Sequence, residues 1–328
     1  MKLKNVFLLI FVFGLFQAYT QAQIAPNTYW VQFTDKNGTP YSISLPGQFL
    51  SERAVERREK QNIEITTDDL PVNPAYVDSL RSLGLTIKYA SKWLNGVVVY
   101  STDISLLDTL HQLSFVAKPV GISHTINANR NIDKFCPMPK SATDYGLSRI
   151  QIEMLHGNYL HDAGFRGEGK LIAVLDAGFA NVQEIESLQH LWQNNQVIAT
   201  RDFVNDINGL YNSSIHGTLV LSILAGIIPD NLYGSAPDAD YILVRTENTS
   251  SEFIIEEYNW VAGAEYADSL GADVINSSLG YYLFDDLSQN HSYADMNGKT
   301  TPVSIGASIA ARKGIVVCNS AGNAGDYN

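Results

Sequence analysis

The feature that most constrains this chain is an alternation of apolar strands and long helices from residue 146 onward. Residues 171–175 form a continuous apolar run, which is typical of a strand buried on both faces of a parallel sheet. Similar runs at 241–244, 274–279 and 315–318 predict three more strands. Strand, helix and strand in repetition indicate βαβ units, so we expect an α/β domain with a doubly wound, mostly parallel sheet.

Two of the intervening helices have recognisable ends. Apolar residues at helical spacing from Ile254 onward predict a helix that Ser251 caps and Gly271 stops. A second helix is expected over residues 305–313, closed by Gly314. Such helices return the chain to the start of the next parallel strand.

The segment ahead of this alternation predicts a separate α+β domain of about a hundred residues, a normal size for one core. Its expected elements are strands at 29–33, 85–89, 96–100 and 115–120, and helices at 51–60, 76–83 and 106–113. The helix at 51–60 is rich in charged residues and is expected to be exposed. Residues 121–145 hold Pro137, Pro139 and many small polar residues, which indicates a linker.

Charge divides the chain at the same point. Residues 23–144 hold 12 acidic and 12 basic side chains, whereas residues 145–328 hold 22 acidic and 8 basic ones. This break near residue 145 supports a domain boundary. The net charge of −12 argues against a nucleic-acid partner, because a phosphate backbone requires clustered Lys and Arg.

The N-terminus has the three parts of an export signal. Lys2 and Lys4 form a basic start, residues 6–16 are apolar, and residues 20–22 offer a cleavage site with small side chains. The apolar run is too short to span a bilayer comfortably, and no later stretch is apolar enough. We therefore expect residues 1–22 to be a signal peptide, no transmembrane segment after its removal, and a secreted or cell-envelope protein.

Two cysteines, Cys136 and Cys318, are too few for a disulfide framework. Cys318 ends an apolar strand, where a small buried thiol is the expected state. Cys136 lies in a polar, Pro-containing stretch. The two could pair in an oxidising compartment; two free thiols are favoured, and the sequence leaves the choice open.

Three polar residues occupy positions where α/β sheets place functional groups, at strand ends and at the helix starts that follow. Asp176 follows the buried strand 171–175, His216 opens an apolar helix next to Gly217, and Asn323 follows the last strand. Each has an ordinary structural explanation as well: a turn-capping Asp, a surface His, and a turn Asn beside a glycine. Taken singly, none of them establishes a function.

Their order and surroundings resemble the subtilisin-like serine peptidases. The matching segments are Ile172 to Gly178, His216 to Val220, Tyr233 to Pro237, Asp273 to Gly280, and Ser320 to Asn323. The order Asp then His is also the one found in subtilisin. The similarity covers residues 146–328, and residues 23–120 more loosely resemble the inhibitory propeptide of that family.

The resemblance implies a role for each matching residue. Asp176 would orient His216, His216 would act as general base and then acid, and Asn323 would donate to the oxyanion. The substrate-binding residues would be Ser278, Leu279, Gly280, Ser320, Ala321 and Gly322. The substrates would be polypeptides, the other partner the chain's own propeptide, and the chemistry would need no cofactor and no metal.

The chain departs from the family pattern in three places. Ala177 stands where a Ser or Thr is usual, so one hydroxyl beside the carboxylate is missing. Leu219 to Ser222 replace the usual continuation of the His segment. No G-T-S-x-x-x-P segment with the nucleophilic serine occurs in the 328 residues, which we interpret as truncation within residues 146–328 of an incomplete peptidase domain.

Other functions are less well supported. A non-catalytic protein, binding peptides or acting only through its inhibitor-like region, stays open until a nucleophile is found. Dinucleotide binding is disfavoured because Gly164, Gly167 and Gly169 precede the strand that a phosphate loop must follow. Structural calcium would fit the resemblance, but the run from Asp295 to Gly298 is explained equally well by an exposed turn.

The missing serine leads to a prediction for the 328-residue chain by itself. Without a hydroxyl to attack the substrate carbonyl, a His–Asp pair cannot form an acyl-enzyme. We expect the expressed chain to remain unlabelled by a fluorophosphonate probe that labels an active subtilisin under the same conditions. Labelling of a defined residue, or self-cleavage between residues 120 and 146, would show that the nucleophile lies inside this sequence.

Overall fold

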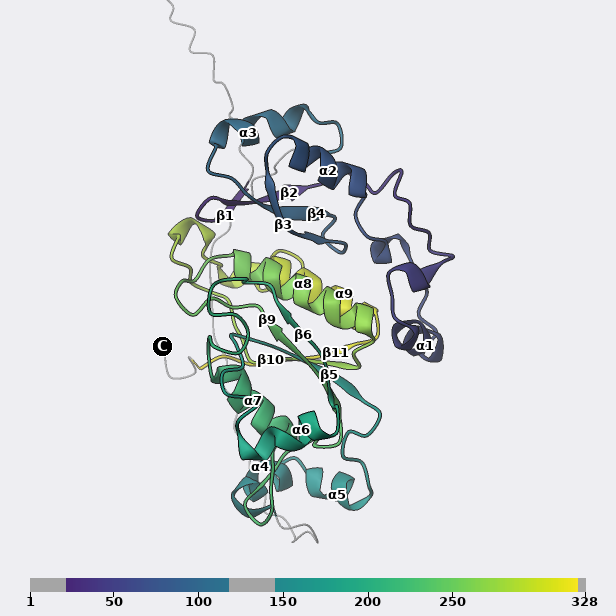
Figure 1. The fold of residues 1–328 in the computed structure, drawn as a ribbon, viewed down its shortest axis with the longest axis vertical. Coiled ribbons are helices and arrows are strands. Elements are labelled where there is room, and N and C mark those ends of the chain that lie inside the picture. The colour runs from purple at the N-terminus through teal and green to yellow at the C-terminus, as the bar shows by residue number, and fades with distance from the viewer. Residues whose placement is uncertain (1–21, 118–144, 324–328) are drawn as a thin grey trace, which may run out of the picture.

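The computed structural model describes residues 22–117 and 145–323. It stacks an antiparallel sheet, a pair of long helices, a parallel sheet and a second set of helices, in that order from the top of Figure 1. The expected signal peptide before residue 22, most of the expected linker, and Cys136 lie outside the described residues.

The parallel sheet has five strands in the order β11-β10-β5-β9-β6. Their bounds are β5 Leu171–Asp176, β6 Val197–Asp202, β9 Asp240–Arg245, β10 Val274–Ser277 and β11 Val316–Asn319. All neighbouring pairs are parallel. The predicted doubly wound α/β sheet is confirmed, and the chain turns from one side of β5 to the other between β9 and β10.

Helices cover both faces of this sheet (Figure 1). Helices α8 Ile255–Leu270 and α9 Pro302–Arg312 lie on one face, and α6 Gln189–Gln193 and α7 His216–Ala225 on the other. Side chains of β5 alternate between the two cores: Ala173 and Leu175 pack with α8, whereas Ile172 and Val174 pack with α7. Burial on both faces explains the continuous apolar run.

The predicted starts of α8 and α9 are wrong, whereas the predicted ends at Gly271 and Gly314 are confirmed. Helix α8 begins at Ile255 rather than after Ser251, whose hydroxyl instead accepts a hydrogen bond from Asn248. Helix α9 begins at Pro302 with Thr301 as its cap, because proline at the first position of a helix loses no backbone hydrogen bond. Gly271 and Gly314 follow the ends with φ of +87° and +86°, which glycine adopts without strain.

The N-terminal unit is an antiparallel sheet of four strands in the order β1-β2-β4-β3. The strands are β1 Ala22–Ala25, β2 Thr28–Gln32, β3 Thr86–Ser91 and β4 Gly96–Tyr100. Helices α2 Pro74–Ser82 and α3 Ile104–Thr109 cover its outer face. The strand expected at 115–120 is reduced, within the described residues, to a bridge between Phe33 and Val116.

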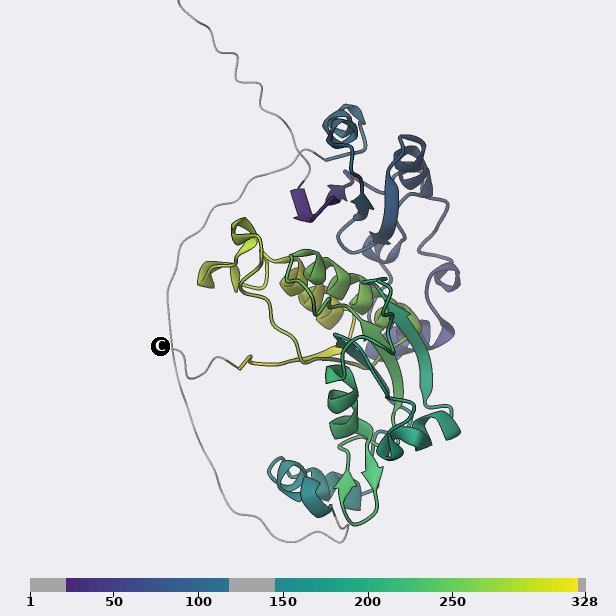
Figure 2. The same ribbon diagram turned by 60° about the vertical axis from the view of Figure 1, so that its left-hand side comes forward.

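The inner face of this sheet packs on α8 (Figures 1 and 2). On β4, Val97 and Val99 point into the unit's own core while Val98 points toward α8, as the two-residue period of a strand requires. Trp30 accompanies Val98, and its ring centroid lies 4.9 Å from that of Tyr258 on α8. The two sheets therefore sandwich α8.

Helix α1 Glu52–Gln61 was expected to be exposed, and this is wrong for one of its faces. Arg57 and Arg58 are only 5% and 1% exposed. They are buried because α1 packs beside the C-terminal end of α8. There Asp268 accepts hydrogen bonds from both arginines. A run of charged residues predicts an exposed helix only when no partner lies elsewhere in the chain.

The remaining elements are short. They are α4 Arg149–Glu153, α5 Gly157–Asp162 and the strand pair β7 Ile227–Ile228 and β8 Leu232–Tyr233. Cys318 is a free thiol and is exposed, contrary to the expected burial, because it lies on the edge strand β11. Within residues 22–117 and 145–323, no helix is long and apolar enough to cross a membrane.

Candidate active site

The sheet brings Asp176 and His216 together from positions 40 residues apart in the chain. Asp176 is the last residue of the central strand β5 and is fully buried. His216 is the first residue of α7, and its side chain is half exposed. Nδ1 of His216 lies 2.7 Å from Oδ1 of Asp176. The pairing that the sequence suggested is present in the structure.

Two glycines make this approach sterically feasible. Gly178 has φ of +145°, and a Cβ there would lie 2.0 Å from the hydroxyl of Ser213. A Cβ on Gly217 would lie 2.5 Å from the backbone oxygen of Gly178, which accepts a 3.0 Å hydrogen bond from the Gly217 amide. The loop after β5 and the start of α7 thus touch through their backbones, which only glycine allows.

The Asp176 carboxylate is unevenly satisfied. Oδ1 accepts hydrogen bonds from His216 and from the Ala177 amide, both at 2.7 Å. Oδ2 is buried and has no hydrogen-bond partner among the described residues. Burial raises the pKa of Asp176, and the hydrogen bonds from His216 and Ala177 oppose that rise. Ala177 has no side-chain hydroxyl that could donate to Oδ2, which is consistent with this oxygen being unpaired.

The geometry fixes how the His216 ring can act. A hydrogen bond to a carboxylate assigns the Nδ1 proton to the bond with Asp176. Nε2 is then the ring nitrogen left to accept a proton from another group. A buried carboxylate that holds a half-exposed imidazole in this tautomer forms the base half of a nucleophilic site.

Arg245 supports the site and was not singled out from the sequence. It ends β9, is 1% exposed, and its guanidinium donates to both carboxylate oxygens of Asp206 at 2.7 and 2.8 Å. Its Nε also donates to the backbone oxygen of Ala177 at 3.3 Å. Hydrogen bonding to Arg245 lowers the pKa of Asp206 to about 2. Arg245 therefore ties the loop that leads to His216 to the residue after Asp176.

The predicted substrate-binding segments meet at one cavity of about 540 Å³. Five of the six predicted residues line it: Leu279, Gly280, Ser320, Ala321 and Gly322. The segments are joined by hydrogen bonds from the Ser320 amide to the Ser277 oxygen, 3.0 Å, and from the Ser320 hydroxyl to the Leu279 oxygen, 2.8 Å. Ser278 is not part of the lining; its hydroxyl accepts from Asn276. The cavity is also lined by apolar side chains, among them Trp260 and Val303.

Asn323 is the last described residue and is exposed. It follows β11, so it lies on the same carboxyl edge of the sheet as Asp176, two strands away. Its proposed contact with an oxyanion stays a prediction.

Comparison with known proteins identifies both parts of the chain. Residues 28–135 match the peptidase S8 propeptide domain of Bacteroidota. Residues 167–328 match the subtilase family. The chain belongs to the subtilase family.

Several curated proteins are similar to this chain. The chain is 28% identical over 200 residues to the C5a peptidase of Streptococcus pyogenes serotype M3, covering 51% of this chain and 16% of the relative. It is 27% identical over 186 residues to subtilisin E of Bacillus subtilis, covering 55% of this chain and 40% of the relative. The chain thus spans less than half the length of either relative.

A solved structure is also similar, that of the epidermin leader peptide processing serine protease of Staphylococcus aureus. The match has a TM-score of 0.45 and 15% identity and covers 76% of this chain and 58% of that one.

The run from Asp295 to Gly298, which the sequence left open between a structural calcium site and an exposed turn, makes local hydrogen bonds. Asp295 accepts hydrogen bonds from the amide and hydroxyl of Ser292, and Asn297 bonds to Thr300. Both residues therefore serve a local turn. In the part of the chain that the structure describes, no group of three or more His, Cys, Asp and Glu residues could hold a metal ion.

Two buried acids lie close to this subtilase site and were missed in the sequence. Glu247, two residues after β9, accepts hydrogen bonds from the Tyr281 and Thr246 hydroxyls, each at 2.7 Å. Glu256 on α8 accepts from the Asn248 amide at 2.8 Å. Burial raises the pKa of both carboxyl groups. The charges of Glu252 and Asp176 raise the pKa of Glu247 further, and the charge of Glu247 raises that of Glu256.

This pair predicts a pH-dependent stability. Because the folded-state pKa of Glu256 lies above its ordinary value of 4.5, its contribution is fully present below about pH 4.5 and is lost as pH rises. We expect Glu256→Gln to leave the urea midpoint unchanged at pH 4.5 and to raise it at pH 8, relative to the unmodified chain. The exposed Glu59→Gln on α1 should have no effect at either pH. A gain of equal size at both pH values would contradict the assignment.

Proposed function

We propose that this chain belongs to an exported, self-inhibited serine endopeptidase that hydrolyses peptide bonds through an Asp-His-Ser triad. The observation that carries the proposal is the buried Asp176 carboxylate bonded to Nδ1 of His216 at the carboxyl edge of the sheet. Membership of the subtilase family supports it. The nucleophilic serine is not among the 328 residues, so the chain by itself would be inactive.

The proposed reaction follows from the roles of the paired groups. Nε2 of His216 would remove the serine proton as the hydroxyl attacks the substrate carbonyl, and would then protonate the leaving amine. Asp176 would hold the imidazole and stabilise its charged form. The amide of Asn323 would donate to the oxyanion of the tetrahedral intermediate. Nε2 of His216 would then remove a proton from water as the water attacks the acyl-enzyme. It would return that proton to the serine oxygen as the acid product leaves.

Substrate would lie along the segments that border the cavity. Residues 278–280 would pair with the substrate as an added β-strand, and residues 320–322 would border the pocket for the side chain before the scissile bond. The hydrogen bonds of Ser320 to Ser277 and Leu279 hold these segments together. Polypeptides in extended conformation are therefore the proposed substrates.

The N-terminal unit would be the propeptide. We propose residues 1–22 as signal peptide, 23–120 as inhibitor domain, 121–145 as the linker that is cleaved, and 146–328 as peptidase domain. Packing of the antiparallel sheet on α8 supports the inhibitor assignment, because it joins this unit to the peptidase domain. The product would be secreted or held in the cell envelope.

Substitution of the base or its orienting acid tests the triad in the complete protein. Asp176→Ala and His216→Ala should each lower kcat by about 10⁴–10⁶, the scale of the subtilisin triad. The exposed His156→Ala should not change it. Near-normal turnover in His216→Ala would sink the assignment. Peptide binding without turnover in the unmodified protein would favour a non-catalytic, peptide-binding or inhibitory module instead.

Asn323 is tested by separating binding from catalysis. Because its amide would meet the oxyanion more strongly than the substrate carbonyl, Asn323→Ala should lower kcat by about 10²–10³. KM should change little. A change confined to KM would place Asn323 in substrate binding rather than in the stabilisation of the transition state.

A further inference from the structure

Residues 51–70, which we name the docking arm, extend from the N-terminal sheet to the far end of α8 and α9. The arm comprises α1 and the turn Thr67–Asp69. We propose that the docking arm recognises the peptidase domain by a buried cluster of charges, and that this cluster selects the chain's own peptidase domain. The inference rests on the proposed role of the N-terminal unit as propeptide.

The cluster is built from ion pairs that cross between the two parts of the chain. On the arm side, Arg57 and Arg58 each lie 2.7 Å from Asp268 of α8. On the peptidase side, Nζ of Lys313 lies 2.8 Å from Asp69 of the arm. Asp69 is itself paired with Arg58 at 2.7 Å. Each part thus supplies both a cation and an anion to the other.

Because these ion pairs are buried, they can distinguish a peptidase domain with matching charges from one without them. Asp69 and Asp268 are fully buried, and the exposed fractions of Arg58 and Lys313 are 1% and 5%. A buried charge that loses its partner is strongly destabilising, whereas a matched pair is tolerated. A peptidase domain without an acid at the position of Asp268 would leave the buried Arg57 without a carboxylate and Arg58 with Asp69 alone, and so would be rejected.

The arm also satisfies backbone oxygens that follow the ends of two helices. Arg53 donates to the Gly271 oxygen at 3.1 Å, and Arg57 donates to the Ala272 oxygen. Arg57 also reaches the Lys313 oxygen, and Gln61 the Gly314 oxygen, each at 3.2 Å. The carboxyl end of a helix carries unpaired oxygens and negative potential, which favour cations. The arginines of the arm therefore complement the ends of both α8 and α9.

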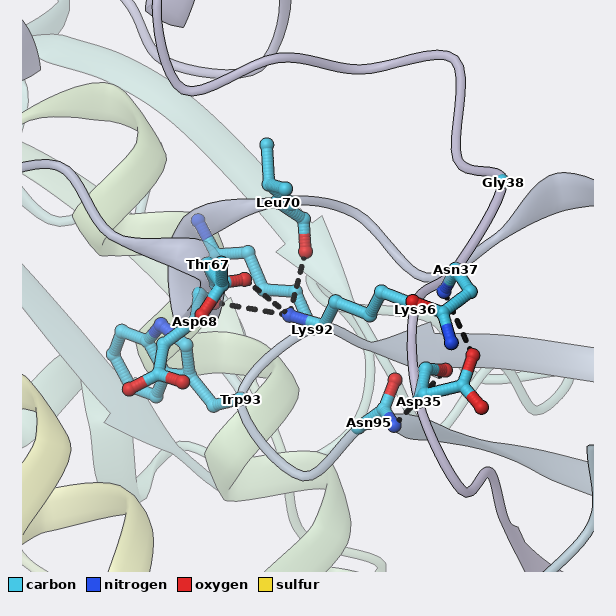
Figure 3. A pocket seen from close by; sticks show the side chains of 10 residues that line it. All are labelled: Asp35, Lys36, Asn37, Gly38, Thr67, Asp68, Leu70, Lys92, Trp93 and Asn95. Carbon is cyan, nitrogen blue, oxygen red and sulfur yellow. Dashed lines mark hydrogen bonds between the residues drawn. The ribbon is translucent and has the colours of Figure 1, made fainter.

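Lys36 fixes the arm to the N-terminal sheet, as Figure 3 shows. Its ammonium group donates to the backbone oxygens of Thr67, Asp68 and Leu70 at 2.9, 3.3 and 2.8 Å. These three residues surround Asp69, so the contacts hold Asp69 between Arg58 and Lys313. Burial lowers the pKa of Lys36 to about 8. These contacts therefore tie the arm to the loop that follows β2.

The second polar contact between the two parts lacks this selectivity. Glu265 of α8 accepts hydrogen bonds from the amides of Lys92 and Trp93 at 2.8 and 3.1 Å. The Ser91 hydroxyl also donates to Glu265, but two of the three donors are backbone amides, which are present in any sequence. Side-chain charges carry the specificity of an interface. Outside the arm, the Lys92 ammonium also approaches Asp268, at 3.5 Å, whereas the shorter ion pairs of Asp268 come from the arm.

Hydrogen exchange of the 328-residue chain tests the proposal without any need for catalysis. Arg58→Gln or Asp268→Asn should reduce the protection of amides 52–61 by about 10²-fold, since the first removes the cation that bridges Asp69 and Asp268 and the second leaves the buried Arg57 without a carboxylate. Protection of β4, residues 96–100, should be unchanged. The control Lys60→Gln removes the same charge from an exposed site on the same helix and should have less than about a twofold effect.

A double-mutant cycle tests the pairing of Arg58 with Asp268. The combined Arg58→Gln and Asp268→Asn change should lose at least about tenfold less protection than the two single losses multiplied together. Unchanged protection of 52–61 in either single variant, or single losses that simply multiply in the double variant, would overturn the proposal. Loss of protection in 96–100 as well would show that the arm belongs to the folding core, and would also overturn it. If the proposed catalytic triad were wrong, turnover would be affected but hydrogen exchange would not, so the two failures can be distinguished.

Discussion

Burial of α8 between two sheets is the constraint on which the rest of the structure depends. Eleven of its sixteen residues are buried, far more than one covered face provides. Val261 and Ala264 pack with the parallel sheet, while Tyr258 packs under the N-terminal sheet. Because α8 is covered on both sides, its position fixes that of β5 below it and of the N-terminal unit above it.

The geometry of the candidate site follows from this arrangement. β5 lies at the centre of the parallel sheet, so its terminal Asp176 is desolvated by neighbours on both faces. A desolvated carboxylate binds a hydrogen-bond donor more strongly than an exposed one. The glycine contacts between the loop after β5 and α7 then bring His216 to it. Buried Asp176 is hydrogen-bonded to His216. The buried charges under the docking arm are likewise paired with one another.

The sequence predicted those parts of the fold that depend on local pattern. The apolar run of β5 could be recognised because both of its faces are buried, and Gly271 because it takes a positive φ. The Asp176–His216 pair could be anticipated because both residues sit at positions that a parallel sheet brings together. The resemblance to subtilases made that anticipation specific.

Other parts depend on partners that no local pattern contains. Arg58 looked exposed because its partner Asp268 lies 210 positions later. Arg245 looked like an ordinary strand end, yet it bonds to the residue after Asp176. The edge strand β6 was missed because its half-buried and exposed residues lack the continuous apolar character of a buried strand. Ser251 was a plausible cap, but α8 begins four residues later.

The hydrogen bond between His216 and Asp176 can be observed directly. In the 328-residue chain labelled with ¹⁵N-histidine, its Nδ1–H proton should give a low-field NMR signal that exchanges slowly, since the acceptor is buried. This signal should disappear in Asp176→Ala and persist in His156→Ala. Absence of the signal in the unmodified chain, or its persistence in Asp176→Ala, would show that Nδ1 of His216 is not hydrogen-bonded to Asp176.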